Sequence, residues 1–323
     1  MNTISSDSLY DSINQASQWL QTKIIGQQTL IQRLMMALLC GGHLLVEGAP
    51  GLAKTRAIKE LARVIEGDFH RIQFTPDLLP SDVTGTEVYR PEDGSFKFQQ
   101  GPIFHNLILA DEINRAPAKV QSALLEAMAE HQVSVGRETF PLADLFMVMA
   151  TQNPIEQEGT YPLPEAQLDR FLMHVIVDYP DADAERNILA LVRSESGTTS
   201  DTPPPQVVSQ EQIFAARQAM LGLHMTDSIE RYIVALVMAT RQQDHDQARW
   251  IDFGASPRAT IALDICARAL AWLSGRDFVT PEDVQAVAHD VLRHRLILSF
   301  EADAQGITGN QVIDSLIEQV PVP

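Results

Sequence analysis

Short apolar runs alternate with helical stretches along the first half of the chain. The runs stand at His43–Glu47, Phe69–Gln73, Leu107–Asp111, Phe146–Thr151 and Met173–Asp178. Apolar runs of this length, separated by segments of helical periodicity, are typical of strands that are covered on both faces. The pattern therefore predicts an α/β fold built on a parallel sheet.

From Asp181 onward the periodicity becomes helical, and no further strand is expected. Helical patterns cover Ala182–Ser194, Gln210–Leu221, Thr226–Thr240, Pro257–Leu273 and Pro281–Leu292. The polar and proline-rich segment 197–205 predicts a loop within this half. Because a chain of 323 residues fits about two domains, we expect one domain at residues 1–180 and an all-α domain at 181–323.

Two hairpins are expected within the first domain. Turn signals at Gly85 and at Asp93-Gly94 predict a hairpin in an insertion at residues 74–101. A second hairpin is predicted over Gln132–Pro141, turning at Gly136. Five acidic residues in the insertion outnumber two basic ones, and its tip is expected to carry neither a basic nor an aromatic stripe.

Charge and cysteine content narrow the classes of partner. The chain has 24 Lys and Arg against 42 Asp and Glu, a formal net charge of −18. Such a surface repels nucleic-acid phosphates and anionic lipid, so neither partner is expected.

Two distant cysteines and an N-terminus without a leader pattern predict a cytoplasmic protein. The longest apolar stretch, Leu34–Val46, is too short for membrane insertion.

The strongest chemical signal follows the first predicted strand. The glycine-containing loop precedes a helical run, which is the context of a phosphate-binding P-loop; its residues are Gly48, Ala49, Pro50, Gly51, Leu52, Ala53, Lys54 and Thr55. Backbone N–H groups at a helix N-terminus bind phosphate, Lys54 would reach the β and γ phosphates, and Thr55 would ligate Mg²⁺. Ala53 departs from the usual glycine. The alternative is a plain strand–turn–helix in which Gly and Pro only break structure.

A second signal is the apolar strand Leu107–Asp111, which ends in the carboxylates of Asp111 and Glu112. Asp111 can hold the water shell of Mg²⁺, and Glu112 can polarise an attacking water. A strand that ends in Asp-Glu is common by itself. Its position some 55 residues after the P-loop makes the catalytic interpretation the stronger one.

Three further residues are candidates for contact with phosphate. Asn153 follows another buried strand and can present its amide to water or to the γ-phosphate, although Asn-Pro is also a plain turn initiator. Arg170 precedes the last strand and is equally explained as a surface arginine paired with Asp169 or a nearby Glu. Arg258 lies in the first turn of a helix, where a cation opposes the helix dipole, as a phosphate-sensing arginine would.

Taken together, these motifs resemble the MoxR family of AAA+ ATPases. The resemblance covers roughly residues 10–320 and rests on the P-loop with Ala53, which is the family's own variant, and on five further phrases. They are Asp111-Glu112-Ile113-Asn114-Arg115-Ala116, Ala150-Thr151-Gln152-Asn153-Pro154, Gly254-Ala255-Ser256-Pro257-Arg258-Ala259 and the pair Gly275-Arg276-Asp277 and His294-Arg295-Leu296.

The resemblance implies a P-loop NTPase αβα core with a five-stranded, mainly parallel sheet and an all-α lid, binding ATP and Mg²⁺. Ile25 and Gly26 would lie on the adenine side, Asn153 would be sensor 1 and Arg258 sensor 2. Arg170 would be an arginine finger acting on a neighbour's nucleotide, which requires a homo-oligomeric ring, most often a hexamer. The insertion at 74–101 would be the helix-2 insert of this clade.

The function that the resemblance implies is ATP hydrolysis that drives chaperone-like remodelling, assembly or activation of protein complexes, including metal-cofactor insertion. The partner is often an adaptor with a von Willebrand factor A domain. Three alternatives stay open: the motor subunit of a metal chelatase, a nucleic-acid-dependent AAA+ motor, and a nucleotide switch that does not hydrolyse. The negative charge weighs against the nucleic-acid motor, and Glu112, Asn153 and Arg170 weigh against the switch.

Overall fold

A computed structural model describes residues 6–155, 159–197, 203–204, 206–242 and 249–323. The chain divides into two compact units, Met1–Leu163 with Val175–Ile213, and Pro164–His174 with Phe214–Pro323. These units group residues by spatial proximity, so the expected domain boundary after residue 180 stays a prediction.

A five-stranded sheet forms the centre of the first unit, in the order β2-β5-β8-β1-β9. Its strands are β1 (Leu44–Gly48), β2 (Phe69–Gln73), β5 (Leu107–Asp111), β8 (Met147–Gln152) and β9 (Met173–Val177). The pairs β2–β5, β5–β8 and β8–β1 are parallel. All five predicted strands are confirmed to within one residue at each end.

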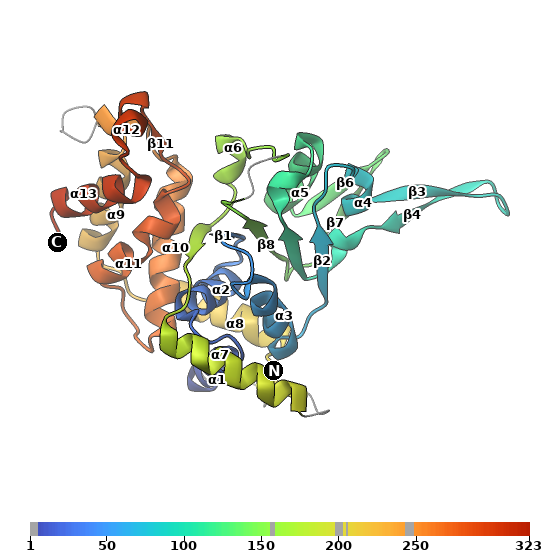
Figure 1. The fold of residues 1–323 in the computed structure, drawn as a ribbon, viewed down its shortest axis with the longest axis horizontal. Helices are drawn as coiled ribbons and strands as arrows, with labels where there is room; N and C mark the ends of the chain where they lie inside the picture. The colour runs from blue at the N-terminus through green and yellow to red at the C-terminus, as the bar shows by residue number, and fades with distance from the viewer. Residues whose placement is uncertain (1–5, 156–158, 198–202, 205, 243–248) are drawn as a thin grey trace. The chain divides into compact units, whose positions relative to one another are not determined.

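Helices cover both faces of this sheet because of the way its strands are connected. Besides the short α4 described below, the α-helices of the unit are α1 (Ser6–Lys23), α2 (Gln28–Cys40), α3 (Lys54–Val64), α5 (Ala118–Glu130), α7 (Ala182–Gly197) and the start of α8 (Gln210–Leu221). The crossover through α3 leads from β1 to β2, and the one through α5 leads in the opposite direction along the sheet. Since parallel crossovers are right-handed, α3 and α5 lie on opposite faces (Figure 1). The strands between them are buried, as the apolar runs predicted.

Both predicted hairpins are present. The insertion after β2 contains the short helix α4 (Pro80–Thr84) and the antiparallel pair β3 (Gly85–Arg90) and β4 (Ser95–Gln100). The second hairpin pairs β6 (Gln132–Val135) with β7 (Glu138–Pro141). The prediction of a turn at Gly85 was wrong. Gly85 begins β3, and a Cβ there would stand 2.3 Å from the carbonyl oxygen of Gln99.

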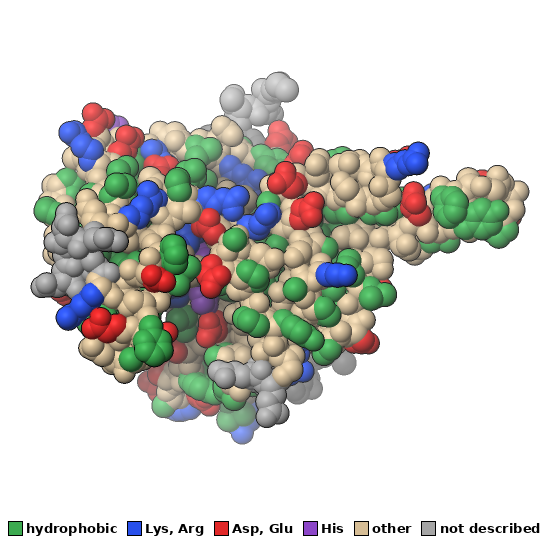
Figure 2. All heavy atoms as spheres, turned by 90° about the horizontal axis from the view of Figure 1, so that it is seen from above, with side chains coloured by type: hydrophobic (Ala, Val, Ile, Leu, Met, Phe, Trp, Pro, Cys, Tyr) green, Lys and Arg blue, Asp and Glu red, His purple; other side chains and the backbone are tan. Residues whose placement is uncertain are grey.

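The insertion projects from the sheet and ends in an apolar tip, which corrects the expectation that the tip carries no aromatic stripe. Tyr89 and Phe96 are 54% and 66% exposed, and their ring centroids lie 5.3 Å apart. Figure 2 shows apolar side chains gathered at the free end of the hairpin. Nearer the sheet, Phe98 stacks on Phe140 of β7 at 4.1 Å. The second hairpin therefore supports the base of the first.

The second unit is mainly helical. Its helices are α6 (Glu165–Leu168), the remainder of α8, α9 (Asp227–Ala239), α10 (Pro257–Leu273), α11 (Pro281–Leu292), α12 (Phe300–Gln305) and α13 (Gly309–Gln319). The expectation of no strand after residue 181 was wrong in one place. A short antiparallel pair joins β10 (Ile251–Phe253) to β11 (Ile297–Leu298), and two- and three-residue strands leave no readable alternation in a sequence.

No described helix combines the length and the apolar character that a membrane span would need.

Candidate functional site

The P-loop connects β1 to α3 through two residues in the left-handed region of backbone conformation. Gly51 has φ of 86° and Ala53 has φ of 56°. Glycine adopts such angles freely, whereas a residue with a Cβ incurs a cost of about 1–2 kcal/mol. Gly48 is required for another reason, because a Cβ there would lie 2.6 Å from the carbonyl oxygen of Val177 in β9.

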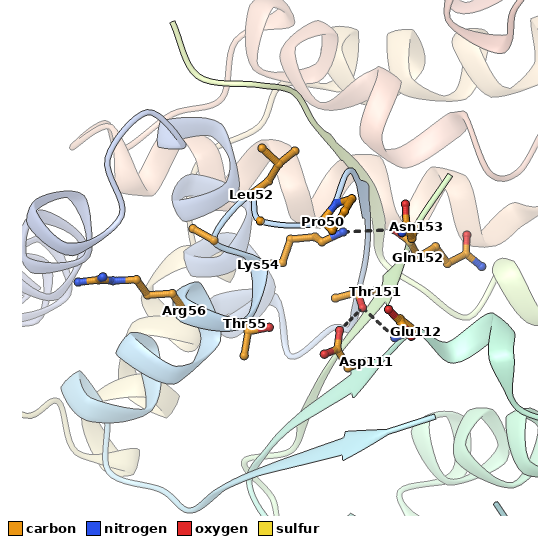
Figure 3. Close-up of a pocket in the computed structure, with 12 residues that line it drawn as sticks. Pro50, Leu52, Lys54, Thr55, Arg56, Asp111, Glu112, Thr151, Gln152 and Asn153 are labelled. Carbon is orange, nitrogen blue, oxygen red and sulfur yellow. Dashed lines mark hydrogen bonds between the residues drawn. The ribbon is translucent and has the colours of Figure 1, made fainter. Parts of the chain in front are cut away.

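A cavity of about 350 Å³ opens above this loop, at the carboxyl ends of β1, β5 and β8. This is where ligands bind in open α/β sheets. Twelve residues line it: Pro50, Gly51, Leu52, Ala53, Lys54, Thr55, Arg56, Asp111, Glu112, Thr151, Gln152 and Asn153 (Figure 3). The structure thus brings together nine of the residues that the sequence predicted for one site. Gly48 and Ala49 stand just before this lining, at the strand end and the start of the loop.

Lys54 is held by backbone carbonyls at one side of the cavity. Its Nζ donates to the oxygen of Gly48 at 2.5 Å and to that of Gln152 at 3.4 Å. Burial lowers the pKa of Lys54, while the nearby charges of Asp111 and Glu112 raise it. The ammonium group is therefore placed between the loop and β8, where an anionic ligand would meet it.

Asp111 is oriented from both neighbouring strands. Its Oδ1 accepts a hydrogen bond from the hydroxyl of Thr151 in β8 at 2.6 Å. Its Oδ2 accepts from Nε and Nη2 of Arg71 in β2, at 3.0 and 2.6 Å. Sequence reasoning missed Arg71, because only the register of β2 against β5 shows that it shares a face with Asp111.

Glu112 follows β5 in the left-handed region, with φ of 56°. Its backbone N–H donates to the hydroxyl of Thr151 at 2.9 Å, so Thr151 joins both acids (Figure 3). Its Oε2 accepts from Nε2 of Gln73 at 3.1 Å and from Nε of Arg115 at 2.9 Å. Unusual backbone angles persist where the surroundings enforce them, often at functional sites, and here they turn the second carboxylate toward β2.

Asn153 supports both interpretations of its sequence position. Its Oδ1 accepts the backbone N–H of Ile155 at 3.1 Å, which is the turn-initiating role. The side chain also lines the cavity and is only 7% exposed. Because the carbonyl oxygen closes the turn, the amide nitrogen is the group that a sensing role would use.

The other lining residue with a charge, Arg56, points away from the acid pair (Figure 3). Its guanidinium pairs with Glu195 of α7, with Nη1 3.2 Å from Oε2. This pairing connects the first turn of α3 to α7 and leaves Lys54 and Thr55 as the residues of the helix start that face the acids.

Ile25 and Gly26 lie outside this lining. Gly26 has φ of 79°, and a Cβ there would stand 2.9 Å from the Cβ of Pro180 and 3.0 Å from that of Ala184. The neighbouring Gln27 donates from Nε2 to the carbonyl oxygen of Asp178 at 3.0 Å. The segment therefore packs against the chain that leads from β9 into α7, and its adenine-side role stays a prediction.

Arg170 and Arg258 both belong to the second compact unit. Arg258 lies in the first turn of α10, where its backbone N–H donates to the N-cap hydroxyl of Ser256 at 3.2 Å. Asp169, the neighbour considered as a partner for Arg170, binds Arg295 at 2.8 Å. The roles predicted for these two arginines stay predictions.

The donor set fits ATP with Mg²⁺. Mg²⁺ keeps several waters and takes only one or two protein ligands beside substrate phosphates, and Thr55 with Asp111 offers such a pair in the cavity. Within the described residues there is no cluster of three His, Cys, Asp or Glu that would hold a metal by itself. A strand that leads into a phosphate-binding loop, together with an acid pair at the end of β5, two strands away in the same sheet, defines the class of P-loop NTPases.

Comparison with known proteins narrows the class to a family. The description "ATPase family associated with various cellular activities (AAA)" matches residues 43–173, and "AAA lid domain" matches residues 243–316. Chaperone MoxR1 of Mycobacterium tuberculosis is 47% identical, over 93% of this chain and 79% of that protein. YeaC of Bacillus subtilis, an uncharacterised protein, is 43% identical over 98% and 97%. The chain belongs to the MoxR family of AAA+ ATPases, as its motifs predicted, and it is an ATPase.

The fold agrees with this assignment. A crystal structure of a candidate ATPase from Cytophaga hutchinsonii has a TM-score of 0.90 at 44% identity, covering 98% of this chain and 97% of that one. The predicted P-loop core with a helical lid is therefore confirmed. Magnesium-chelatase subunits are more distant; the 38 kDa subunit of Chlorobaculum parvum is 25% identical over 85% of this chain.

Proposed function

We propose that this ATPase is a chaperone-like motor that hydrolyses ATP to remodel, assemble or activate partner protein complexes. The observation that carries the proposal is the single cavity in which Lys54, Thr55, Asp111, Glu112 and Asn153 meet. A protein that only binds nucleotide has no need of a second carboxylate beside the metal-binding one.

The chemistry follows from the positions of these side chains. Lys54 would leave the two backbone carbonyls and bind the β and γ phosphates, and the backbone N–H groups of residues 51–55 would surround these phosphates. Thr55 and Asp111 would hold Mg²⁺, which supplies charge neutralisation on the phosphates. Glu112 would accept a proton from the attacking water, a role that contributes about 10²–10⁴-fold, and Asn153 would orient that water or the γ-phosphate as sensor 1. Ile25 and Gly26 would lie beside the adenine.

The role proposed for Arg170 requires a ring of subunits. Arg170 would reach the γ-phosphate bound to a neighbouring subunit, a contribution worth about 10³–10⁵-fold in related phosphoryl transfers. Arg258 would act as sensor 2. The assembly would be a cytoplasmic homo-oligomer, most often a hexamer in this family, and its adaptor would carry a von Willebrand factor A domain.

Two observations favour a protein client over a nucleic acid. The net charge of −18 repels phosphate backbones. The insertion exposes apolar side chains at its tip, Val88, Tyr89 and Phe96, and exposed apolar patches commonly mark sites of protein interaction. The name of the relative from Mycobacterium tuberculosis, a chaperone, supports the same proposal.

A second candidate is the motor subunit of a metal chelatase, in which the remodelled client receives a metal. It is favoured by the likeness to magnesium-chelatase subunits, at 25–30% identity. The two candidates share the same ATPase chemistry and differ in the client.

The test is the ATPase rate per subunit as a function of protein concentration, with Arg170→Ala alongside. A specific activity that rises with concentration and is lost in the variant supports a ring with shared sites. Turnover that is independent of concentration and insensitive to the variant would mean self-contained sites, and the ring would have to be abandoned.

A further inference from the structure

Arg295 fastens the segment that carries Arg170. Its side chain is 3% exposed. The Nε atom donates to Oδ1 of Asp169 at 2.8 Å, and the two Nη atoms donate to the carbonyl oxygens of Phe171 at 2.7 Å and Leu172 at 3.2 Å. The guanidinium thus binds one residue before Arg170 and two residues after it.

The two residues before Arg295 reinforce this attachment. His294 bonds through Nε2 to the carbonyl oxygen of Phe171 at 3.1 Å. Arg293 donates to the carbonyl oxygen of His174 and to Oδ1 of Asp290. Three consecutive side chains just after the end of α11 therefore hold the segment 169–174 within the second unit. This contact gives the motif His294-Arg295-Leu296 a structural role.

Asp169 connects the same segment to α10. Its Oδ2 accepts the hydroxyl of Ser256 at 2.9 Å, and Ser256 is the N-cap of the helix that begins with Pro257 and Arg258. Burial lowers the pKa of Arg295, Asp169 raises it, and Arg258 lowers it further. The charges of Arg295 and Arg258 therefore act on each other within this unit.

The chemistry of the contact is specific to arginine. Guanidinium presents five donors in a rigid fork, whereas an ammonium group on a flexible stem is a point charge. Arg295 uses the fork on a carboxylate and several carbonyls that point from different directions. A lysine would keep the charge but lose most of these bonds.

We propose that Arg295 and Asp169 are positioning residues that hold Arg170 to the lid, so that the arginine offered to a neighbouring subunit moves as one body with α10 and Arg258. The inference rests on the proposed function, in which Arg170 acts on the neighbour's nucleotide. It predicts that weakening the contacts of Arg295 lowers ATP hydrolysis at the neighbouring subunit's site, where Arg170 acts. Hydrolysis at the subunit's own nucleotide site should not change.

Mixed rings separate these two effects. Lys54→Ala subunits keep Arg170 but lack a working nucleotide site, and Arg170→Ala subunits have the reverse defect. A mixture of the two hydrolyses ATP only where an intact site meets an intact arginine. In the donor arm, Arg295→Lys is added to the Lys54→Ala subunit, which supplies Arg170 to its neighbour. In the acceptor arm, Arg295→Lys is added to the Arg170→Ala subunit, which supplies the intact nucleotide site.

We expect the donor arm to lose at least tenfold in kcat with KM for ATP unchanged, because displacing a catalytic group by about 1 Å can cost 10²-fold. The acceptor arm should stay within about twofold of the unmodified mixture. Equal losses in both arms, or no loss in either, would overturn the positioning role. Asp169→Asn in the same two arms repeats the test should Arg295→Lys lower the folded fraction seen by circular dichroism.

A matched control is Arg276→Lys. Arg276 forms another arginine–carboxylate pair in the same unit, with Nη1 2.7 Å from Oδ2 of Asp283. This nitrogen also donates to the carbonyl oxygen of Phe278, and both partners lie outside residues 164–174. It should leave both arms unchanged. Should Lys54→Ala and Arg170→Ala subunits fail to complement at all, the shared site of the proposed function fails too. Complementation that is unchanged by Arg295→Lys would exclude the positioning role of Arg295 and leave the shared site in place.

Discussion

Ala53 occupies a backbone conformation that alanine rarely adopts, at the end of the P-loop. Its φ of 56° would suit glycine, the residue that most P-loops place before the lysine. The residue is nevertheless half-buried in a loop that continues directly into α3. The strain is therefore a local cost that the surrounding fold sustains.

We predict that Ala53→Gly raises the free energy of unfolding by about 1 kcal/mol, because the left-handed cost is removed while the unfolded chain gains some freedom. Denaturant unfolding without nucleotide measures the change. Ala57→Gly is the matched control: Ala57 lies within α3, where glycine should destabilise by about 1 kcal/mol. A loss of stability in Ala53→Gly would show that the left-handed angle carries no strain.

Glu112 and Lys54 serve different steps, so their variants should separate binding from hydrolysis. Glu112→Gln should bind ATP and hydrolyse it at least about a hundredfold more slowly, since the general base is lost. Lys54→Ala should lose nucleotide binding itself. Fluorescent-nucleotide titration and phosphate release measure the two steps, with Glu126→Gln on the exposed side of α5 as control. Near-normal turnover in Glu112→Gln would remove that residue from the mechanism.

Among the elements, the start of β1 is joined to α5 and β8 by the buried ring of His43. The backbone N–H of Val148 donates to Nδ1 at 3.0 Å, and Nε2 bonds to the carbonyl oxygen of Met128 at 3.2 Å. Since Nδ1 accepts, Nε2 carries the proton. Burial, together with nearby His131, lowers the pKa of His43 to about 4. A second proton on the ring would break the bond to Val148.

This pKa makes the first unit sensitive to acid. Between pH 6.5 and about 4 the unfolded chain binds a proton at His43 that the folded chain does not. The contribution of neutral His43 to the free energy of unfolding is therefore fully present above pH 6.5 and is lost as the pH falls toward 4. The loss amounts to about 3 kcal/mol at full extent. In His43→Gln the free energy of unfolding should depend less on pH between pH 6.5 and 4 than in the wild type. Above pH 7 the pH dependence of the two proteins should be the same. Parallel curves throughout would exclude His43 as the source.

For the whole molecule, the distribution of charge decides the kind of partner. A net charge of −18 accompanies an insertion whose acidic residues outnumber the basic ones and whose tip is aromatic. Exposed aromatic rings can also stack on bases. Because acidic residues outnumber basic ones by five to two within the insertion, the charge argument prevails.

We therefore predict no measurable binding of a labelled single-stranded DNA at about 0.15 M ionic strength, with or without ATP. Fluorescence anisotropy of the full chain checks this, and Tyr89→Ser with Phe96→Ser is the variant to compare should any signal appear. Binding that survives this salt concentration and vanishes in the double variant would favour the nucleic-acid motor over the protein remodeller.

Much of the fold and of the candidate site could be predicted from local patterns in the sequence. The apolar runs mark all five strands of the sheet, because a strand covered on both faces needs apolar side chains throughout. The short pair β10–β11 and the position of Gly85 escaped prediction. The first is too short for a period, and the second depends on a close approach to the backbone of β4.

The sequence by itself determined the P-loop, the acid pair and the family, since each depends on residue types at fixed spacing along one strand–loop–helix or strand end. Only the tertiary structure decided that Thr151 joins Asp111 to Glu112, that Arg71 reaches Asp111, and that Arg295 holds the segment of Arg170 from 126 residues away. Strand order, register and helix packing bring such residues together. These are set by the burial of the whole core, which no local pattern encodes.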